Sequence, residues 1–182
     1  MLGGYIVTFI LLIGVLGVLV VMLLKRPILG RLGGDNNLVD YLGKAKWFHN
    51  YWLAGIFLFI MNTALFLITG FILYLLTLFL IPFVHLFVML LAVIGSILIW
   101  LLINKAWRGT RSNRLKMGLI GSSFYFFLTI IFIYKLVTLK PAYPGEDTFM
   151  AAIGLIFAIV VAAVAFTACF AFTGFSKKEE NM

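Results

Sequence analysis

Charged side chains are scarce in this sequence. Only 11% of the residues are Asp, Glu, Lys or Arg, and the whole chain holds six Asp and Glu residues. Because a soluble domain carries roughly a quarter charged residues, this composition excludes a soluble chain and an intrinsically disordered one. The single cysteine, Cys169, excludes a disulfide framework and is expected to be a small apolar residue inside the protein. Hydrophobic residues make up 64% of the chain, which predicts an all-α integral membrane protein.

Long runs without any charge divide the chain into membrane spans. A helix needs about 20 apolar residues to cross a hydrocarbon core of about 30 Å, so the run 47–104 must cross twice. Pro82 lies near the middle of that run and suits the first turn of a helix, where no N–H donor is needed. We therefore predict a single helical domain, residues 1–182, with five transmembrane spans. These lie near 3–24, 52–76, 82–104, 117–139 and 148–174.

The first run has the character of a retained span and not of a cleaved signal peptide. No basic residue precedes it, its apolar stretch is longer than that of a signal peptide, and it lacks an A-x-A cleavage site. The mature protein is expected to keep it.

Lys and Arg residues set the orientation of the five spans. Of the 14 in the chain, only Lys135 and Lys140 fall on one side of the predicted spans. Because cytoplasmic loops carry an excess of Lys and Arg, loops 25–50 and 105–116 are predicted to be cytoplasmic. The N-terminus is then outside and the C-terminus cytoplasmic, in the plasma (cytoplasmic) membrane. Four tryptophans are expected to form an interfacial belt at the cytoplasmic boundary: Trp47, Trp52, Trp100 and Trp107.

Loop 25–50 contains the pattern of an amphipathic helix near 37–49. Its apolar residues recur at helical spacing: Leu38, Tyr41, Leu42, Ala45 and Phe48. Asp40 and Lys44 lie on the opposite side at a spacing that allows an ion pair. We expect this helix to lie in the headgroup region of the membrane.

Loop 105–116 is strongly basic and has no acidic residue. Its cations are Lys105, Arg108, Arg111, Arg114 and Lys116. Such a cluster attracts anionic lipid headgroups by about 1 kcal/mol per residue. Two alternatives stay open: it serves only as the topology signal, or it docks an acidic partner. A nucleic-acid partner is not expected, because the segment is short and tethered at the membrane.

Residues for membrane chemistry are few. The predicted spans hold no Asp, Glu, Lys or Arg at mid-depth, which argues against ion-coupled pumps. His49 and His85 are expected near opposite membrane faces and cannot share one metal ion or haem. Ser122 is separated from His85 by some 15 Å at 1.5 Å per helical residue, too far for a nucleophile and its base. No catalytic, cofactor or metal site is predicted, and an enzyme is not expected.

Polar and small residues within the spans predict helix packing. Asn62, near the middle of the second span, must find a hydrogen-bond partner, and Thr129 in the fourth span is a candidate. Gly118 and Gly121 are expected to let helices approach closely.

Small residues also recur at steps of three and four along the last span, on one helix face. They are Ala151, Gly154, Ala158, Ala162, Ala165 and Cys169. This face is expected to pack against a neighbouring helix or another subunit. Gly14 and Gly17 in the first span offer one possible counterpart surface.

Two hypotheses for function follow from these patterns. The first is a non-enzymatic accessory or structural subunit that docks laterally into a larger membrane assembly. The alternative is a small carrier or channel for an apolar or lipid-like solute, suggested by the polar residues at mid-depth. A membrane enzyme ranks third.

Overall fold

The computed structural model describes residues 37–79, 84–141 and 147–175. Throughout these ranges the regular structure is helical, with no strand. Four of the described helices are long and apolar enough to cross a membrane: α4 (Tyr51–Leu78), α5 (Val84–Ala106), α6 (Arg111–Val137) and α7 (Phe149–Gly174). They match four of the predicted spans. The predicted first span, 3–24, with Gly14 and Gly17, lies outside the described residues.

The start of α6 differs from the predicted span, because the helix begins at Arg111 and not near residue 117. Thr110 caps the helix, and its hydroxyl accepts a hydrogen bond of 3.4 Å from the backbone N–H of Asn113. Hydropathy marks where a helix enters hydrocarbon, whereas the cap marks where the helix begins. The first turn of α6 is therefore basic.

The predicted amphipathic helix near 37–49 is two shorter elements in the structure. Helix α3 spans Asn37–Lys44, the 3-10 helix η1 spans Lys46–His49, and Ala45 between them has extended backbone angles. The predicted ion pair is also different, since the Asp40 carboxylate lies 3.9 Å from Nη2 of Arg108. The expectation of one continuous helix with an Asp40–Lys44 pair was wrong because the packing of this segment on other helices overrides its local spacing.

The residues of the predicted apolar face around 37–49 have different environments. Phe48 is 1% exposed and packs against Trp47, Phe57 and Trp107, whereas Tyr41 is 72% exposed. Helix α3 also packs on α5. Part of this face therefore contacts protein.

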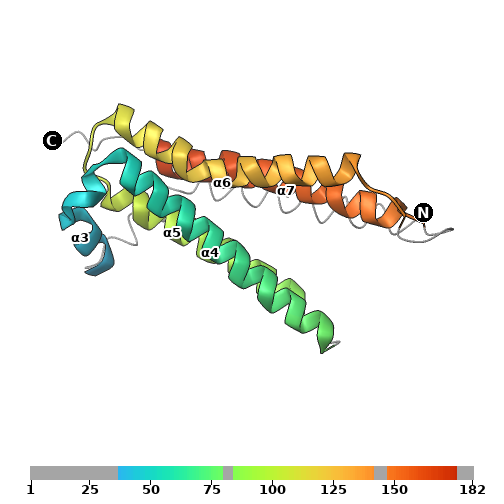
Figure 1. Ribbon diagram of the computed structural model, residues 1–182. Helices are drawn as coiled ribbons and strands as arrows, with labels where there is room; N and C mark the ends of the chain where they lie inside the picture. Colours follow the sequence, from blue (N-terminus) through green and yellow to red (C-terminus); the bar gives the residue numbers. More distant parts are fainter. Residues whose placement is uncertain (1–36, 80–83, 142–146, 176–182) are drawn as a thin grey trace.

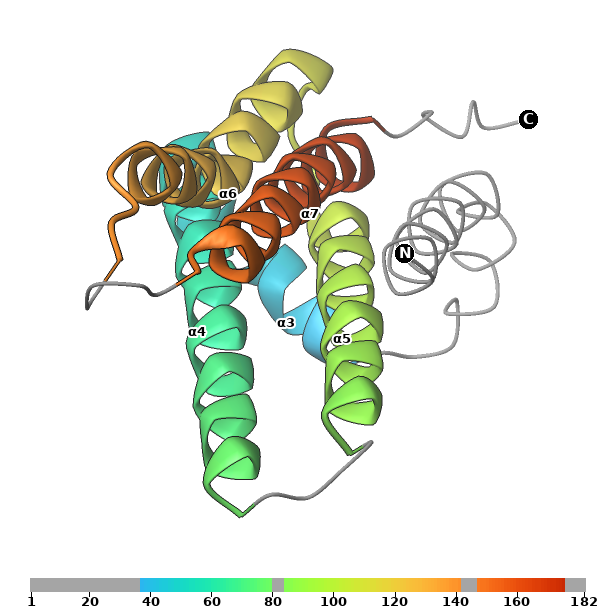
Figure 2. The same ribbon diagram turned by 90° about the vertical axis from the view of Figure 1, so that its right-hand side faces the viewer.

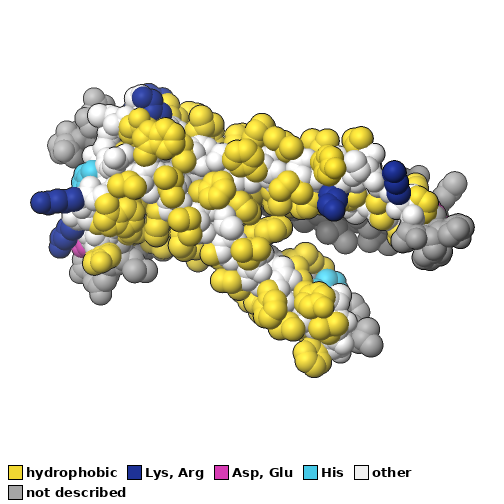
Figure 3. All heavy atoms as spheres, in the orientation of Figure 1, with side chains coloured by type: hydrophobic (Ala, Val, Ile, Leu, Met, Phe, Trp, Pro, Cys, Tyr) yellow, Lys and Arg dark blue, Asp and Glu magenta, His cyan; other side chains and the backbone are white. Residues whose placement is uncertain are grey.

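The four long helices form two pairs that meet at one end (Figure 1). There α3 lies beside them, and α4 packs against α6 while α7 packs against both α5 and α6. Toward the other end α4 and α5 separate from α6 and α7, as Figure 2 also shows. Figure 3 shows hydrophobic side chains over both arms, with Lys and Arg at the end where the pairs meet and toward the far end of the α6–α7 arm.

Glycines let the backbones approach where the pairs meet. A Cβ on Gly55 would stand 2.8 Å from Cβ of Ile120, and a Cβ on Gly118 would stand 2.9 Å from Oγ1 of Thr173. At Gly121 the missing side chain leaves room for that of Leu58. Gly118 and Gly121 thus lie at close helix contacts, as the sequence predicts. The buried core is concentrated at this end of the molecule, where it includes Leu58, Trp100, Met117 and Phe172.

Candidate functional site: a buried polar cluster around Asn62

The side chain of Asn62 joins all four long helices. It lies on α4 and is fully buried. Its Nδ2 donates to the backbone oxygen of Gly121 on α6 at 3.1 Å and approaches Sγ of Cys169 on α7 at 3.5 Å. Its Oδ1 accepts from Nε1 of Trp100 on α5 at 2.8 Å and from the hydroxyl of Tyr125 on α6 at 3.5 Å. One carboxamide therefore links α4 to α5, α6 and α7.

These contacts use both the donor and the acceptor side of the carboxamide. An amide in an apolar interior without partners costs several kcal/mol, on the order of 2 to 7 depending on the reference state. Interhelical hydrogen bonds in membrane proteins contribute about 0.6 kcal/mol each, and at most about 2. The cluster adds little net stability, but breaking it leaves buried polar atoms unpaired.

Gly121 makes the cluster possible in two ways. Its lack of a side chain admits Leu58, one helical turn before Asn62, and so brings α4 against α6. Its carbonyl oxygen then lies within reach of the Asn62 amide. A larger residue at position 121 would push α4 away from α6, and this would separate the Asn62 amide from the carbonyl oxygen of residue 121.

Aromatic rings enclose the carboxamide. Trp100 and Tyr125 meet edge to face with centroids 6.1 Å apart, and Trp100 lies 6.1 Å from the ring of Phe172. The hydroxyl of Ser96, one turn before Trp100, donates to the backbone oxygen of Ala92 at 2.9 Å. The polar atoms are thus shielded by aromatic side chains from three helices.

A second buried carboxamide, Asn104 near the end of α5, holds the end of α7. Its Nδ2 donates to the backbone oxygens of Phe172 at 2.7 Å and Thr173 at 3.0 Å. These are among the last carbonyls of a helix, which have no partner within the helix itself. Sequence reasoning missed Asn104 because its position beside Lys105 suggested the solvated boundary.

Thr129, the partner suggested for Asn62, bonds within its own helix. Its hydroxyl donates to the backbone oxygen of Tyr125 at 2.8 Å. Trp100 was expected at the membrane boundary and not beside Asn62, and the direction of Tyr125 around its helix cannot be counted from sequence, so both partners were missed.

The expected belt of four tryptophans is also corrected. Trp47 and Trp52 are 41% and 55% exposed, as a belt requires, but Trp100 and Trp107 are 4% and 3% exposed. Trp100 is part of the polar cluster, and Trp107 packs edge-on against Phe48. Only Trp47 and Trp52 face outward, and Trp100 lies at the level of Asn62, ten residues along α4 from Trp52.

The small-residue face of α7 changes along its length. Near the polar cluster Ala162 and Cys169 are buried, and Ala158 and Ala165 are partly buried. Toward the start of α7, Ala151 and Gly154 are exposed. Among the described residues, none has an atom within 4 Å of where a Cβ on Gly154 would stand.

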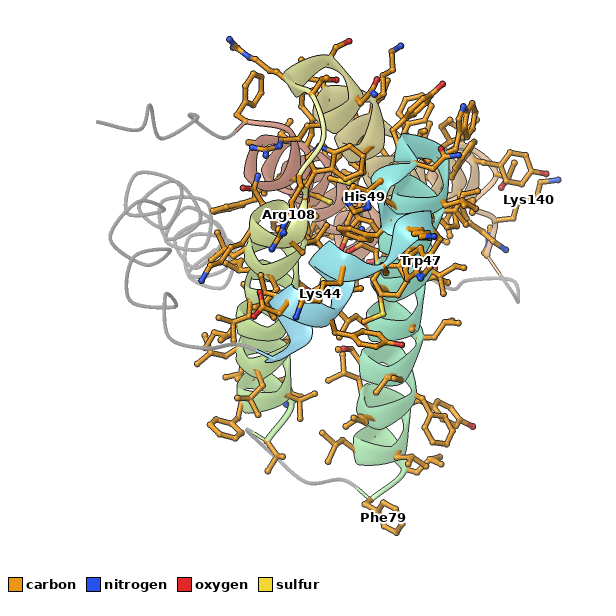
Figure 4. All side chains as sticks on the ribbon, turned by 90° about the vertical axis from the view of Figure 1, so that its left-hand side faces the viewer. Lys44, Trp47, His49, Phe79, Arg108 and Lys140 are labelled. Carbon is orange, nitrogen blue, oxygen red and sulfur yellow. The ribbon has the colours of Figure 1, made fainter. Side chains whose placement is uncertain are left out.

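The basic cluster lies where the helices meet. Figure 4 shows Arg108 at this end together with Lys44, Trp47 and His49. Arg114 donates from Nη2 to the backbone oxygen of Trp107 at 3.2 Å, and Nζ of Lys116 lies 5.3 Å from the ring centroid of Tyr51. The remaining members are Arg108 and Arg111, which are exposed, and Lys105, which is partly buried.

The serine and histidine residues considered as catalytic candidates make hydrogen bonds within their own segments or are exposed. The hydroxyl of Ser122 donates to the backbone oxygen of Leu119, and Nδ1 of His49 lies 3.1 Å from the backbone oxygen of Ala45. His85 is exposed at the start of α5. In the described part of the chain, no three His, Cys, Asp or Glu side chains are grouped to hold a metal ion.

Comparison of the chain with protein-family models, with curated proteins and with solved structures finds no match. The class that the fold defines is a helical protein with four apolar helices of membrane-spanning length.

Proposed function

We propose that this protein is a non-enzymatic accessory or structural subunit that docks laterally into a larger assembly in the plasma membrane. In this proposal the predicted first span joins the four described helices to give five crossings, with the N-terminus outside and the C-terminus in the cytoplasm. The supporting signal for orientation is the Lys and Arg asymmetry of the sequence. Anionic lipids at the cytoplasmic face and another membrane protein are its proposed partners; nucleic acid is not.

One observation carries the docking proposal. Glycines at the end where the pairs meet contact neighbouring helices, whereas glycines farther along the arms have open space at their Cβ positions. Gly55, Gly118 and Gly121 lie against neighbouring helices where the pairs meet. Gly70 and Gly154, farther along the separating arms, have open space at their Cβ positions as far as the described residues extend. Small residues on membrane helices favour close packing, so the open glycines support a partner helix that seats there.

The experiment compares two leucine substitutions on α7. Gly154→Leu fills the open position, whereas Ala163→Leu adds bulk at another exposed position nine residues, or about two and a half turns, farther on. That places Ala163 on the opposite side of the helix. Tagged wild-type and variant proteins are extracted in mild detergent, sized, and their co-purifying polypeptides measured by mass spectrometry.

The proposal expects a stoichiometric second membrane polypeptide with the wild type. It should be lost with Gly154→Leu and retained with Ala163→Leu, while all three proteins keep the same thermal stability. A wild type that runs as a monomer, both in mild detergent and in lipid nanodiscs, would overturn the proposal. A complex that contains only copies of this chain would also overturn it.

The alternative, a small carrier or channel for an apolar or lipid-like solute, is supported by the separation of the two helix pairs (Figures 1 and 2). The same preparation tests it: a monomer that transfers a fluorescent lipid between vesicles would favour the carrier over the accessory subunit.

A further inference from the structure

The loop that joins α5 to α6 holds two unpaired hydrogen-bond donors. Within the described residues, Nε1 of Trp107 and Nε of Arg114 are buried and have no hydrogen-bond partner. Trp107 is 3% exposed, so its indole is shielded from bulk solvent. A buried donor without a partner typically costs about 1 to 3 kcal/mol. Both groups are donors, so the group that would satisfy them is an acceptor such as an anion.

The two donors belong to one compact turn. Nη2 of Arg114 donates to the backbone oxygen of Trp107 at 3.2 Å, which ties the start of α6 to the end of α5. Gly109 lies over the indole: a Cβ there would stand 2.6 Å from Cζ2 and 3.0 Å from Nε1 of Trp107. The backbone of Gly109 therefore lies directly against the N–H side of the indole, where a larger residue would not fit.

The first turn of α6 adds further donors beside this indole. Thr110 caps the backbone N–H of Asn113, while the N–H groups of Arg111 and Ser112 come before the first intrahelical hydrogen bond. The positive end of the helix dipole favours an anion at this position. The 27-residue length of α6 gives it a fully developed dipole.

The charge of the turn also favours an anion. Arg108 and Arg111 are exposed on either side of Gly109 and Thr110. Asp40 lies 3.9 Å from Arg108, but the two side chains are 57% and 60% exposed, so this pair is weak and leaves the guanidinium able to take another partner. Net positive charge therefore remains at the turn.

We propose that the turn from Trp107 to Arg114 binds the phosphomonoester headgroup of an anionic membrane lipid. A phosphomonoester presents three strong acceptor oxygens, which suits donors arranged on the indole, the guanidinium groups and the helix end. A lipid is the source because the turn joins two helices of membrane-spanning length. Trp47 and Trp52 are exposed at the same end of the molecule, as interfacial residues are. This inference does not depend on lateral docking or on which face is cytoplasmic.

The test measures lipid selectivity by the full-length protein. The probes are phosphatidic acid, which carries a phosphomonoester, and phosphatidylglycerol, which carries a phosphodiester. Each is incorporated in phosphatidylcholine nanodiscs at fractions matched for surface potential, and bound lipid is counted by native mass spectrometry. The wild type should bind phosphatidic acid at least about fivefold more tightly than phosphatidylglycerol.

Two variants test whether the preference for phosphatidic acid comes from the turn. Trp107→Phe keeps an aromatic ring but removes the indole N–H, and Arg111→Gln removes one charge at the helix start. Each should reduce the preference for phosphatidic acid at least threefold. Lys116→Gln removes an equal charge from a side chain that lies over Tyr51, and it should weaken both lipids equally. Thermal unfolding of each variant shows whether the fold is kept.

Three results would overturn the proposal. Equal binding of the two lipids by the wild type would mean that only surface charge is sensed. Full selectivity in folded Trp107→Phe and Arg111→Gln proteins would place the site elsewhere. Loss of phosphatidic acid binding in millimolar inorganic phosphate, with phosphatidylglycerol binding unchanged, would make free phosphate the ligand. If a variant fails to fold, the comparison of the two lipids and the phosphate competition, both with the wild type, still test the proposal.

Discussion

The carboxamide oxygen of Asn62 accepts a hydrogen bond of 2.8 Å from the indole nitrogen of Trp100, and this bond joins α4 to α5 inside the core. The two residues lie on consecutive helices whose connection is at the far end of the arms (Figure 1). The bond therefore fixes how α4 and α5 face each other near the middle of α4.

Replacement of Asn62 with Leu should destabilise the protein by about 1 to 3 kcal/mol. The change removes the acceptor of Trp100 and leaves the buried indole N–H unpaired. Equilibrium unfolding in mixed detergent micelles measures the decrease in the free energy of unfolding. Thr129→Val is the control and should be nearly neutral, because the Thr129 hydroxyl bonds only its own helix backbone in the described structure.

The double variant Asn62→Leu/Trp100→Phe should be less destabilised than the sum of the two single variants. With the indole N–H removed, Asn62→Leu no longer leaves it without an acceptor. Strict additivity would mean that the two residues do not interact in the folded protein.

Substitution of Gly121 by Ala should cost about 1 to 3 kcal/mol, since an added Cβ overlaps the side chain of Leu58. The matched control is Gly70→Ala on α4, where the described residues leave the Cβ position open. That control should be neutral or stabilising by up to about 1 kcal/mol, because alanine favours a helix interior. Equal melting temperatures for the two variants would contradict the close contact of α4 with α6.

Ala162→Leu should lower the thermal stability of the isolated protein, because Ala162 is 3% exposed and faces other helices. Overpacking a closed interior typically costs about 1 to 3 kcal/mol. Ala163→Leu, at the adjacent exposed position, should leave the melting temperature within a degree or two of the wild type. The reverse order of stabilities would mean that the face of α7 around Ala162 is not internal.

Cysteine labelling tests the orientation. In a Cys169→Ala background, Ser112→Cys should be labelled by a membrane-impermeant maleimide only after cell lysis, and Lys140→Cys should be labelled in intact cells. Both positions are exposed, so failure to label would not come from burial. Labelling of Ser112→Cys from outside would invert the proposed topology.

The sequence predicts the extent of the long helices better than their contacts. Charge-free runs place α4, α5 and α7 to within a few residues, because apolar length is a property of the chain itself. The same runs say little about which side of a helix meets protein, since lipid and protein interiors are equally apolar. Trp52 and Trp100 are both predicted at the same membrane boundary, yet one is 55% exposed and the other is 4% exposed and bonded to Asn62.

The polar cluster could be predicted in part. A carboxamide in the middle of a span requires a partner, and Asn62 has four. Their identity depends on how the four helices are rotated about their axes, and the side chain of Leu58 at Gly121 brings only α4 and α6 together. Neither Gly121 nor Leu58 shows that pairing in its local sequence.

The convergence of the helix pairs at one end gives the described domain unequal cross-sections. Near Asn62 the four helices share one core, and toward Phe79 and Lys140 the two arms diverge (Figures 1 and 4). In a bilayer, such a body would occupy less area in one leaflet than in the other. Lipids around the described helices would therefore be crowded unequally in the two leaflets.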